Sequence, residues 1–303
     1  MRLAIHSQAL KDIFEGKCNP LTQNIILASK ISITPEILNQ YTILLGSDEF
    51  YKTWFASNSH AKRFSINFAD QTPNLVKTAD LSCDGYGAAS YYGASNLVAE
   101  NTHLTTTTIS TLSEIGVELI SIKNTIHTNI HGDNPFHTMG LKKSGTADFT
   151  IFDKYLHPED SIVIYDKFIN NESTELIEHI AKKLSAGSKL KIFHSSILGP
   201  NLLSSAAILA RVQTANSSIV VSCEVCTKSF TSGTHDRYIF LGNRIQIVFT
   251  AGLDCFGKKN LSTGVRSNKQ SQIVFYDVTQ GETLEICALN GTSCFVKYIS
   301  DHA

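Results

Sequence analysis

The sequence contains no long apolar run. Its most apolar stretches, such as residues 25–28 and 245–250, fall far short of the roughly 20 residues that a membrane-spanning helix needs. The N-terminus also lacks a basic segment that leads into an apolar one, which is the pattern of a secretory signal. We therefore expect a cytoplasmic protein with no transmembrane segment.

The sequence also lacks an excess of charge of either sign. Lys and Arg together number 26, against 27 for Asp and Glu. This balance excludes a global positive field of the kind that drives sequence-independent binding to phosphate backbones. Any nucleic-acid site must therefore be a local patch of basic residues.

Cysteines do not occur in the dense, even set that is typical of a secreted disulfide scaffold. The seven cysteines are scattered over both halves of the chain, so we expect reduced thiols. Cys223 and Cys226 form a C-x-x-C pair, and Cys287 and Cys294 are their candidate partners in a zinc site. Structural zinc sites usually have two tightly spaced pairs, whereas six residues separate the second pair here. Buried thiols are therefore favoured, and no metal or other cofactor is expected.

At 303 residues, of which 42% are hydrophobic, the chain is long enough for two cores of ordinary domain size. In residues 1–125, short β-branched runs alternate with helical ones. Strands are expected at residues 3–5, 31–33, 96–99 and 117–122, and helices at 7–14, 35–45, 84–92 and 108–115. Strands separated by helices predict an α/β domain with a mostly parallel sheet covered on both faces.

Residues 126–147 are polar and rich in His and Gly, so this segment is the expected linker. A second α/β domain is expected over residues 148–303. Its first part alternates strands at 161–165 and 189–194 with helices at 173–184 and 202–215. The later strand-like runs, from residue 218 onward, follow one another with turn residues between them. We therefore expect antiparallel strands at the end of the chain.

Polar residues end or follow several predicted elements of the first domain. His6 follows the first strand, and Asn101 lies within the run at residues 94–104, which reads as a late strand and the turn after it. Gln40 lies in the second predicted helix, and Asp84 begins the small-residue helix before the late strand. In the order of these elements the domain resembles a PIN-type nuclease, a family that usually carries acidic residues at such positions.

This resemblance implies a PIN-type fold that has lost its metal-dependent nuclease activity. PIN-type nucleases hold divalent cations in a carboxylate cluster at the carboxyl ends of parallel strands, where the metal prepares water to attack a phosphodiester. Only Asp84 keeps the expected acid, while Glu36 and Glu100 are candidate substitutes that are shifted from the pattern. The resemblance thus implies a degenerate, metal-free site that is kept for binding or docking. The alternative is an unrelated α/β domain whose polar residues merely end strands.

The sharpest local motif lies in the second domain. Thr-His-Asp-Arg-Tyr at residues 234–238 begins a predicted strand, and a predicted hairpin turn follows at Gly242 and Asn243. Gly-Leu-Asp at residues 252–254 then precedes the aromatic residue Phe256. This order of elements resembles the C-terminal domain of MIT-domain proteins, which has a phospholipase-D-like fold.

The phospholipase-D superfamily uses a histidine nucleophile, a second histidine as general acid, and lysines that stabilise the phosphoryl charge. This chain supplies one such element, so the resemblance implies His235, Arg237 and Asp254 as catalytic candidates and a dimer that brings two His235 side chains together. Arg237 is also expected to hold a phosphate bidentately. Further phosphate-binding candidates lie in the following Ser/Asn/Gly-rich loop, namely Lys258, Lys259 and Arg266, with Lys269 close by.

The same motif fits a purely structural role, because His235 and Arg237 share one face of a strand and Asp236 points away. We predict a nucleic-acid-associated binding or assembly protein of a bacterial defence or mobile-element system, with a catalytically degenerate PIN-like domain. One alternative is a metal-independent phosphodiesterase or nuclease that uses His235 in a dimer. The other is a noncatalytic adaptor that binds an anionic headgroup or a protein partner.

Overall fold

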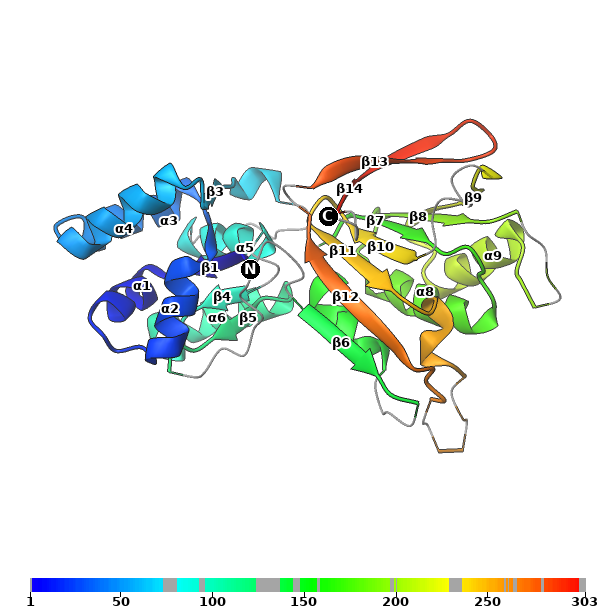
Figure 1. Cartoon of the computed structure of the whole chain (residues 1–303), viewed down its shortest axis with the longest axis horizontal. Helices are drawn as coiled ribbons and strands as arrows, with labels where there is room; N and C mark the ends of the chain where they lie inside the picture. Colours follow the sequence, from blue (N-terminus) through cyan, green and yellow to red (C-terminus); the bar gives the residue numbers. More distant parts are fainter. Residues whose placement is uncertain are drawn as a thin grey trace. The chain divides into compact units, whose positions relative to one another are not determined.

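The computed structural model describes most of the chain. The described residues are 2–72, 81–92, 96–123, 137–143, 148–156, 159–196, 199, 201–228, 236–258, 260, 262–263, 266–278 and 281–299. The chain divides into two compact units, Met1–Asp133 and Asn134–Ala303 (Figure 1). The division falls inside the segment that the sequence predicts as a linker.

The first unit contains a five-stranded parallel sheet, which confirms the predicted parallel arrangement and adds one strand, β3, to the four that the sequence predicts. The strands are β1 (Arg2–Ile5), β2 (Lys30–Ile33), β3 (Phe64–Ile66), β4 (Asn96–Val98) and β5 (Glu118–Ile120). They are arranged in the order β3-β2-β1-β4-β5, so the strand order changes direction between β1 and β4. Ligands of open α/β sheets bind outside the carboxyl ends of the strands at such a point.

Helices connect these strands. They are α1 (Ser7–Phe14), α2 (Pro20–Ala28), α3 (Pro35–Leu45), α4 (Glu49–His60), α5 (Leu81–Tyr92) and α6 (Thr106–Glu114), with the short 3-10 helices η1 (Ala69–Gln71) and η2 (Asn101–His103). Asn19 and Thr34 cap α2 and α3 through side-chain oxygens, and a proline starts each of these helices. Within the described ranges, no helix combines the length and apolar character needed to cross a membrane.

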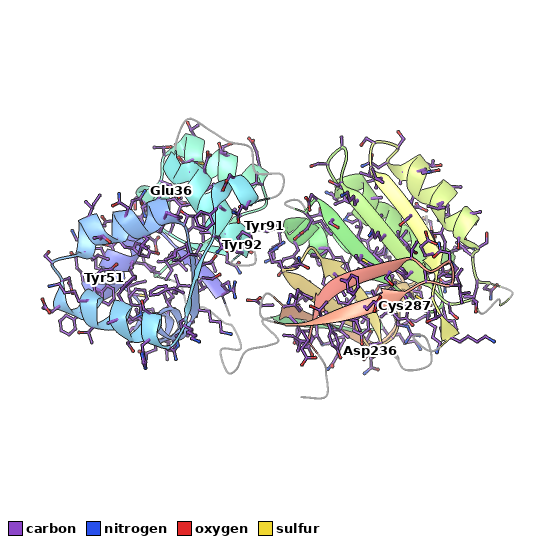
Figure 2. All side chains as sticks on the ribbon, turned by 90° about the horizontal axis from the view of Figure 1, so that it is seen from above. Glu36, Tyr51, Tyr91, Tyr92, Asp236 and Cys287 are labelled. Atoms are coloured by element: carbon purple, nitrogen blue, oxygen red, sulfur yellow. The ribbon has the colours of Figure 1, made fainter. Side chains whose placement is uncertain are left out.

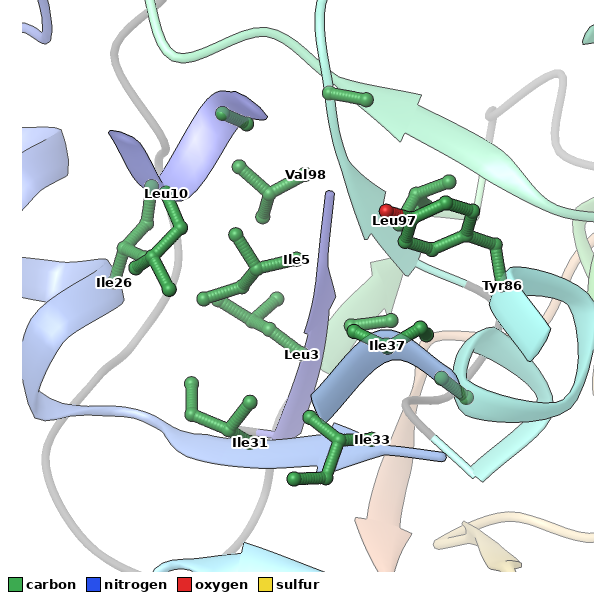
Figure 3. Packing of buried hydrophobic residues seen from close by; sticks show 14 of the residues in the cluster. Leu3, Ile5, Leu10, Ile26, Ile31, Ile33, Ile37, Tyr86, Leu97 and Val98 are labelled. Carbon is green, nitrogen blue, oxygen red and sulfur yellow. The ribbon is translucent and has the colours of Figure 1, made fainter. Parts of the chain in front are cut away.

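The core of the first unit surrounds β1, whose residues are all buried. Leu10 of α1 and Ile26 of α2 lie on one side of β1, and Ile37 of α3 and Tyr86 of α5 lie on the other (Figure 3). The sheet is therefore covered on both faces, as expected for parallel strands with helical connections.

The second unit contains a seven-stranded mixed sheet in the order β6-β12-β11-β10-β7-β8-β9. β7 (Ser161–Tyr165), β8 (Lys189–His194) and β9 (Val220–Val225) are parallel to one another. β10 (Arg237–Leu241), β11 (Ile245–Phe249), β12 (Ser271–Asp277) and β6 (His137–Leu141) pair in antiparallel fashion. Because β10 is antiparallel to β7, the first residue of β10 lies beside the carboxyl end of β7.

Strand β6 differs from the sequence prediction, which placed a linker over residues 126–147. Its residues pair with β12, with Met139 opposite Ile273. Thr138 and Gly140 are exposed, and Leu141 is buried. An edge strand pairs on one side only and needs little apolar surface, so its polar sequence resembles that of a connecting segment.

Two layers cover this sheet. The helices α8 (Asn171–Lys183) and α9 (Ser205–Ala215) lie on one side, and the antiparallel hairpin of β13 (Glu282–Cys287) and β14 (Ser293–Tyr298) lies on the other (Figure 1). Ile286 and Val296 of the hairpin pack with Tyr165, Phe240 and Val248 of the sheet. The short elements η3 (Phe149–Phe152), α7 (Asp153–Leu156) and η4 (Leu253–Phe256) complete the unit. The expected antiparallel end of the chain is confirmed.

The four cysteines weighed as zinc ligands lie in or beside three strands of this unit. Cys223 is on β9, Cys226 follows that strand, and Cys287 and Cys294 are on the hairpin (Figure 2 labels Cys287). Burial raises the pKa of both Cys223 and Cys226 to about 12, which disfavours the thiolate that binds zinc. Among the described residues, no group of three or more His, Cys, Asp or Glu side chains is arranged to hold a metal ion.

Candidate functional site

The carboxyl end of β7 carries a buried carboxylate. Asp166 directly follows the strand, and its side chain is 2% exposed. It accepts hydrogen bonds from two backbone N–H groups, Phe168 at 3.0 Å and Leu253 at 3.1 Å. Burial raises the pKa of Asp166, while these two bonds and nearby Arg237 act in the opposite direction. Asp166 therefore ties the loop after β7 to η4.

Arg237, the first residue of β10, lies beside this carboxylate. Its Nε is 3.5 Å from Oδ1 of Asp166, and its side chain is 20% exposed. The guanidinium carbon lies 5.8 Å from the centre of the Phe168 ring, and Nζ of Lys167 lies 5.7 Å from the same centre. Phe168 is 36% exposed. This edge of the sheet thus presents two cations beside an aromatic ring that solvent reaches.

Gly252 brings Asp254 close to Arg237. Its φ of 98° lies in a region that favours glycine. A Cβ atom on Gly252 would lie 3.0 Å from Oδ1 of Asp254 and 3.7 Å from Nε of Arg237, so both side chains pack against this glycine. Asp254 also accepts hydrogen bonds from Nδ2 of Asn170 at 3.1 Å and from Nζ of Lys269. The structure therefore brings together two of the three predicted catalytic residues.

Arg266, a predicted phosphate ligand, already has three partners. Its Nη1 donates to Glu175 at 2.7 Å and to the carbonyl oxygen of Gly257 at 3.1 Å. Its guanidinium carbon lies 4.0 Å from the centre of the Phe149 ring. These contacts connect α8 with the chain on either side of the loop that follows η4.

The remaining predicted residues of this unit are not all described. Lys258 is exposed two residues after η4. Lys259 and His235 lie outside the described residues. The sequence places His235 two positions before Arg237, and its catalytic role in a dimer stays a prediction.

The carboxyl end of β1 in the first unit carries a neutral ring. Nδ1 of His6 accepts a hydrogen bond from the backbone N–H of Gln8 at 3.1 Å, which caps α1. The ring stacks on Tyr86 at 4.7 Å and on His103 at 5.5 Å between centres. Burial and the nearby His103 lower the pKa of His6 to about 4, against an opposing effect of Asp12. His6 is therefore uncharged at neutral pH.

His103, at the end of η2 beyond β4, has both ring nitrogens engaged. Nδ1 accepts a hydrogen bond from the backbone N–H of Glu100 at 3.1 Å, so Nε2 carries the proton and donates to Oδ2 of Asp12 at 2.9 Å. Oδ1 of Asp12 accepts hydrogen bonds from Gln8 and Lys17, each at 3.1 Å. Donors therefore surround the Asp12 carboxylate, and Lys17 offsets its charge.

The other predicted residues of the degenerate site occupy different environments. Gln40 accepts a hydrogen bond from the hydroxyl of Tyr86 at 2.6 Å, and the Tyr86 ring stacks on His6, so the structure links Gln40 with His6. Asp84 is buried in the first turn of α5. Asn101 is exposed in η2.

The two candidate substitute acids are placed differently. Glu36 is exposed in the first turn of α3. Oε1 of Glu100 accepts hydrogen bonds from Oγ of Ser121 at 2.7 Å and from the backbone N–H of Ile122 at 2.8 Å. The Glu100 carboxylate therefore fastens the end of β4 to the chain after β5.

Sequence reasoning did not single out several residues of these two edges. Asp12 and its partner His103 are 91 positions apart, and no local pattern links them. Phe168 and Asn170 closely follow Asp166. The only sequence signal that could have pointed to them is the position of Asp166 at the end of a predicted strand. Long-range pairing of this kind becomes visible only in the fold.

Comparison with known proteins does not assign the chain to a family. No protein-family model matches the sequence, and no curated protein matches it either. The PIN-like and phospholipase-D-like resemblances therefore stay predictions that rest on short motifs. The strand orders and side-chain contacts supply the basis for a functional proposal.

Proposed function

We propose that this chain is a nucleic-acid-associated binding protein whose second unit holds backbone phosphates at the edge formed by β7, β10 and η4. The observation that carries the proposal is Arg237, which buried Asp166 contacts from one side while part of the side chain stays open to solvent. Arginine recognises phosphate oxygens through a planar fork of N–H groups. A guanidinium that is already positioned loses less side-chain entropy on binding.

The charge around Arg237 supports an anionic ligand. Lys167 and Lys269 add two cations, and Asp166 and Asp254 add two carboxylates. Asp236, the residue before Arg237, adds a third carboxylate, so the three cations and three carboxylates at this edge balance. The cations Arg237, Lys167 and Lys269 form the local cluster that a chain without a global positive field requires to bind an anion.

Phe168 supports nucleic acid as the source of the phosphate. Its ring is partly exposed and is contacted by both Arg237 and Lys167. Aromatic side chains beside cations are typical of surfaces that bind single strands, because a base stacks on the ring while the cations meet the backbone. A free phosphate or a lipid headgroup offers no such base.

The first unit supports a noncatalytic role. Divalent cations require several carboxylate oxygens, whereas the edge at β1 presents the neutral ring of His6 and the amide of Gln40. The Asp12 carboxylate is bound by His103 and Lys17. We therefore assign this unit to binding or assembly and expect no metal-dependent cleavage from it.

Fluorescence anisotropy with a labelled 20-nucleotide single strand of DNA or RNA tests the binding proposal. Arg237→Gln is expected to weaken binding at least about tenfold, because it removes a charge-assisted phosphate contact. Arg237→Lys keeps the charge without the fork and is expected to fall between Arg237→Gln and the unaltered protein. Lys182→Gln, in the last turn of α8, is the matched control and is expected to change little.

Equal binding by the unaltered protein and Arg237→Gln would contradict the proposal. Binding only to vesicles that contain anionic lipid would favour the adaptor alternative. Incubation of the same strands with EDTA, or with magnesium and manganese, completes the test, and we expect no cleavage. EDTA-resistant cleavage lost in His235→Ala would establish a phosphodiesterase, whereas metal-dependent cleavage lost in Asp84→Ala would overturn the noncatalytic assignment of the first unit.

A further inference from the structure

A polar pair lies at the next strand end of the same sheet, beside the phosphate-binding edge. His194 is the last residue of β8 and is 7% exposed. Ser205 is the first residue of α9 and is partly exposed. Oγ of Ser205 lies 2.7 Å from Nε2 of His194. A candidate nucleophile thus contacts a candidate base at hydrogen-bond distance.

The surrounding contacts fix the direction of this hydrogen bond. Nδ1 of His194 lies 2.9 Å from the carbonyl oxygen of Ser195. A carbonyl oxygen only accepts, so Nδ1 carries the proton, and Nε2 of the neutral ring accepts from the Ser205 hydroxyl. Burial lowers the pKa of His194 despite the opposing effect of the Ser195 carbonyl, so the ring is uncharged and ready to take a proton at neutral pH. Nucleophile, base and orienting group are all present.

The start of α9 supplies donors for a developing negative charge. The first N–H groups of an α-helix have no intrahelical acceptor and carry a partial positive charge. Ser204 caps the helix by accepting from the backbone N–H of Ala207 at 3.3 Å. The backbone N–H groups of Ser205 and Ala206, the first two residues of α9, are thus the candidate donors to the oxyanion of a tetrahedral intermediate.

The position in the sheet favours acyl over phosphoryl chemistry. Phosphoryl transfer depends on cations around the phosphate oxygens. The strand β7 separates β8 from β10, so His194 and Arg237 start from backbones roughly 10 Å apart at the usual strand spacing. The backbone of Lys167 lies nearer, since its carbonyl oxygen accepts from the N–H of Ser195 at 3.4 Å, but its Nζ lies beside the Phe168 ring, which Arg237 also contacts. Backbone N–H donors and a neutral base suit a carbonyl substrate instead.

We propose that Ser205 and His194 form an acyl-transfer site that acts on carboxylic esters. Oγ of Ser205 attacks the ester carbonyl carbon while Nε2 of His194 takes the hydroxyl proton. The bond from carbon to the alkoxy oxygen then breaks, and the alcohol leaves with that proton. Water attacks the acyl-serine, His194 takes a proton from the water and returns it to Oγ, and the carboxylic acid is released.

The test uses the full chain with two probes, a fluorophosphonate and p-nitrophenyl acetate. We expect the fluorophosphonate to attach to Ser205, located by peptide mass spectrometry, and the acetate ester to be hydrolysed. Ser205→Ala should abolish both reactions. His194→Gln keeps a hydrogen-bond acceptor but loses the base, so it should slow both by at least about a hundredfold.

Thr214→Ala, at an exposed position in the last turn of α9, also removes a hydroxyl and serves as the matched control, with both reactions retained. Circular dichroism of each variant verifies its fold, and a misfolded His194→Gln is replaced by His194→Asn. Absence of labelling in the unaltered protein, or labelling that persists in Ser205→Ala, would overturn the proposal. Loss in Ser205→Ala with full activity in His194→Gln would refute the assigned base. None of these outcomes depends on phosphate binding at Arg237.

Discussion

The carboxyl ends of the parallel strands carry neutral side chains in the first unit and charged ones in the second. In the first unit, His6, Tyr86 and Gln40 meet through ring stacking and neutral hydrogen bonds. In the second unit, Arg237 lies against a buried carboxylate, Asp166. Both places lie at the carboxyl ends of parallel strands, where α/β proteins bind ligands. The two units therefore share the position of the edge in the fold, and the side chains decide whether an ion is favoured there.

The largest effect is expected from Asp166→Ala, which disrupts the charged edge formed by β7, β10 and η4. This change removes the carboxylate beside Arg237 and the acceptor of two backbone N–H groups. Loss of a buried carboxylate that accepts two backbone hydrogen bonds should lower the free energy of unfolding of the second unit by about 3–5 kcal/mol, because both N–H groups lose a charged acceptor. Urea unfolding followed by far-UV circular dichroism measures this loss.

The chain has one tryptophan, Trp54, which packs in the core of the first unit. Its fluorescence midpoint should stay unchanged in Asp166→Ala while the circular dichroism transition shifts. Asp160→Ala, at an exposed position just before β7, is the control and should leave both transitions in place. A fluorescence shift as large as the circular dichroism shift would show that the effect is not confined to the charged edge.

The next largest effect is the pH dependence that His6 gives to the stability of the first unit. The pKa of His6 in the folded chain, about 4, lies below its ordinary value of 6.5. As the pH falls from 6.5 toward 4, the unfolded chain takes up a proton that the folded chain does not. The contribution of His6 to the free energy of unfolding of the first unit is therefore complete above pH 6.5. It is lost as the pH falls through this window, by on the order of 3 kcal/mol.

His6→Asn keeps an N-cap acceptor but cannot titrate, so it should remove this part of the acid dependence. Urea midpoints from Trp54 fluorescence at pH 7 and pH 4.5 provide the measurement. His60→Asn, at an exposed position of α4, is the control and should retain the dependence. An unchanged pH dependence in His6→Asn would contradict the assignment of a neutral, buried His6.

The smallest effect is expected from Tyr86→Phe, which keeps the ring that stacks on His6 and so isolates the hydrogen bonds of the hydroxyl. The change removes the hydroxyl that donates to Gln40 and accepts from the backbone N–H of Ser7 at 3.1 Å. Loss of these two hydrogen bonds should lower the free energy of unfolding by about 1–2 kcal/mol, measured by urea unfolding followed by Trp54 fluorescence. Tyr92→Phe, whose hydroxyl makes an exposed bond to Gln71, should cost less. Equal losses of unfolding free energy in Tyr86→Phe and Tyr92→Phe would mean that burial does not strengthen the hydrogen bonds of Tyr86.

Most of the fold was predictable because its strands are short β-branched runs between helices. The parallel sheet of the first unit and the antiparallel end of the second are confirmed. The prediction omitted two helices and a strand of the first unit. The helices are α2 (Pro20–Ala28) and α4, whose mixed polar and aromatic residues Glu49–His60 lack a clear apolar face; the strand is β3, whose three residues are only partly buried or exposed. Strand β6 was missed because pairing with β12, and not its own composition, holds it in the sheet.

The two edges were predictable only in part. Arg237 and Asp254 were singled out by a local motif, and the structure brings them together at Gly252. Their anchors are distant in sequence, because Asn170 binds Asp254 across 84 positions and Leu253 binds Asp166 across 87. Such partners depend on strand order and on loop paths, which a single sequence does not reveal.

A phosphate site at Arg237 is best tested by the salt dependence of oligonucleotide binding. Each phosphate contact to a single strand adds about 0.7 to the slope of the logarithm of the binding constant against the logarithm of salt concentration. Arg237→Gln is expected to lower this slope by about that amount, while Lys182→Gln leaves it unchanged. An Arg237→Gln slope equal to that of the unaltered protein would contradict a phosphate site at this edge.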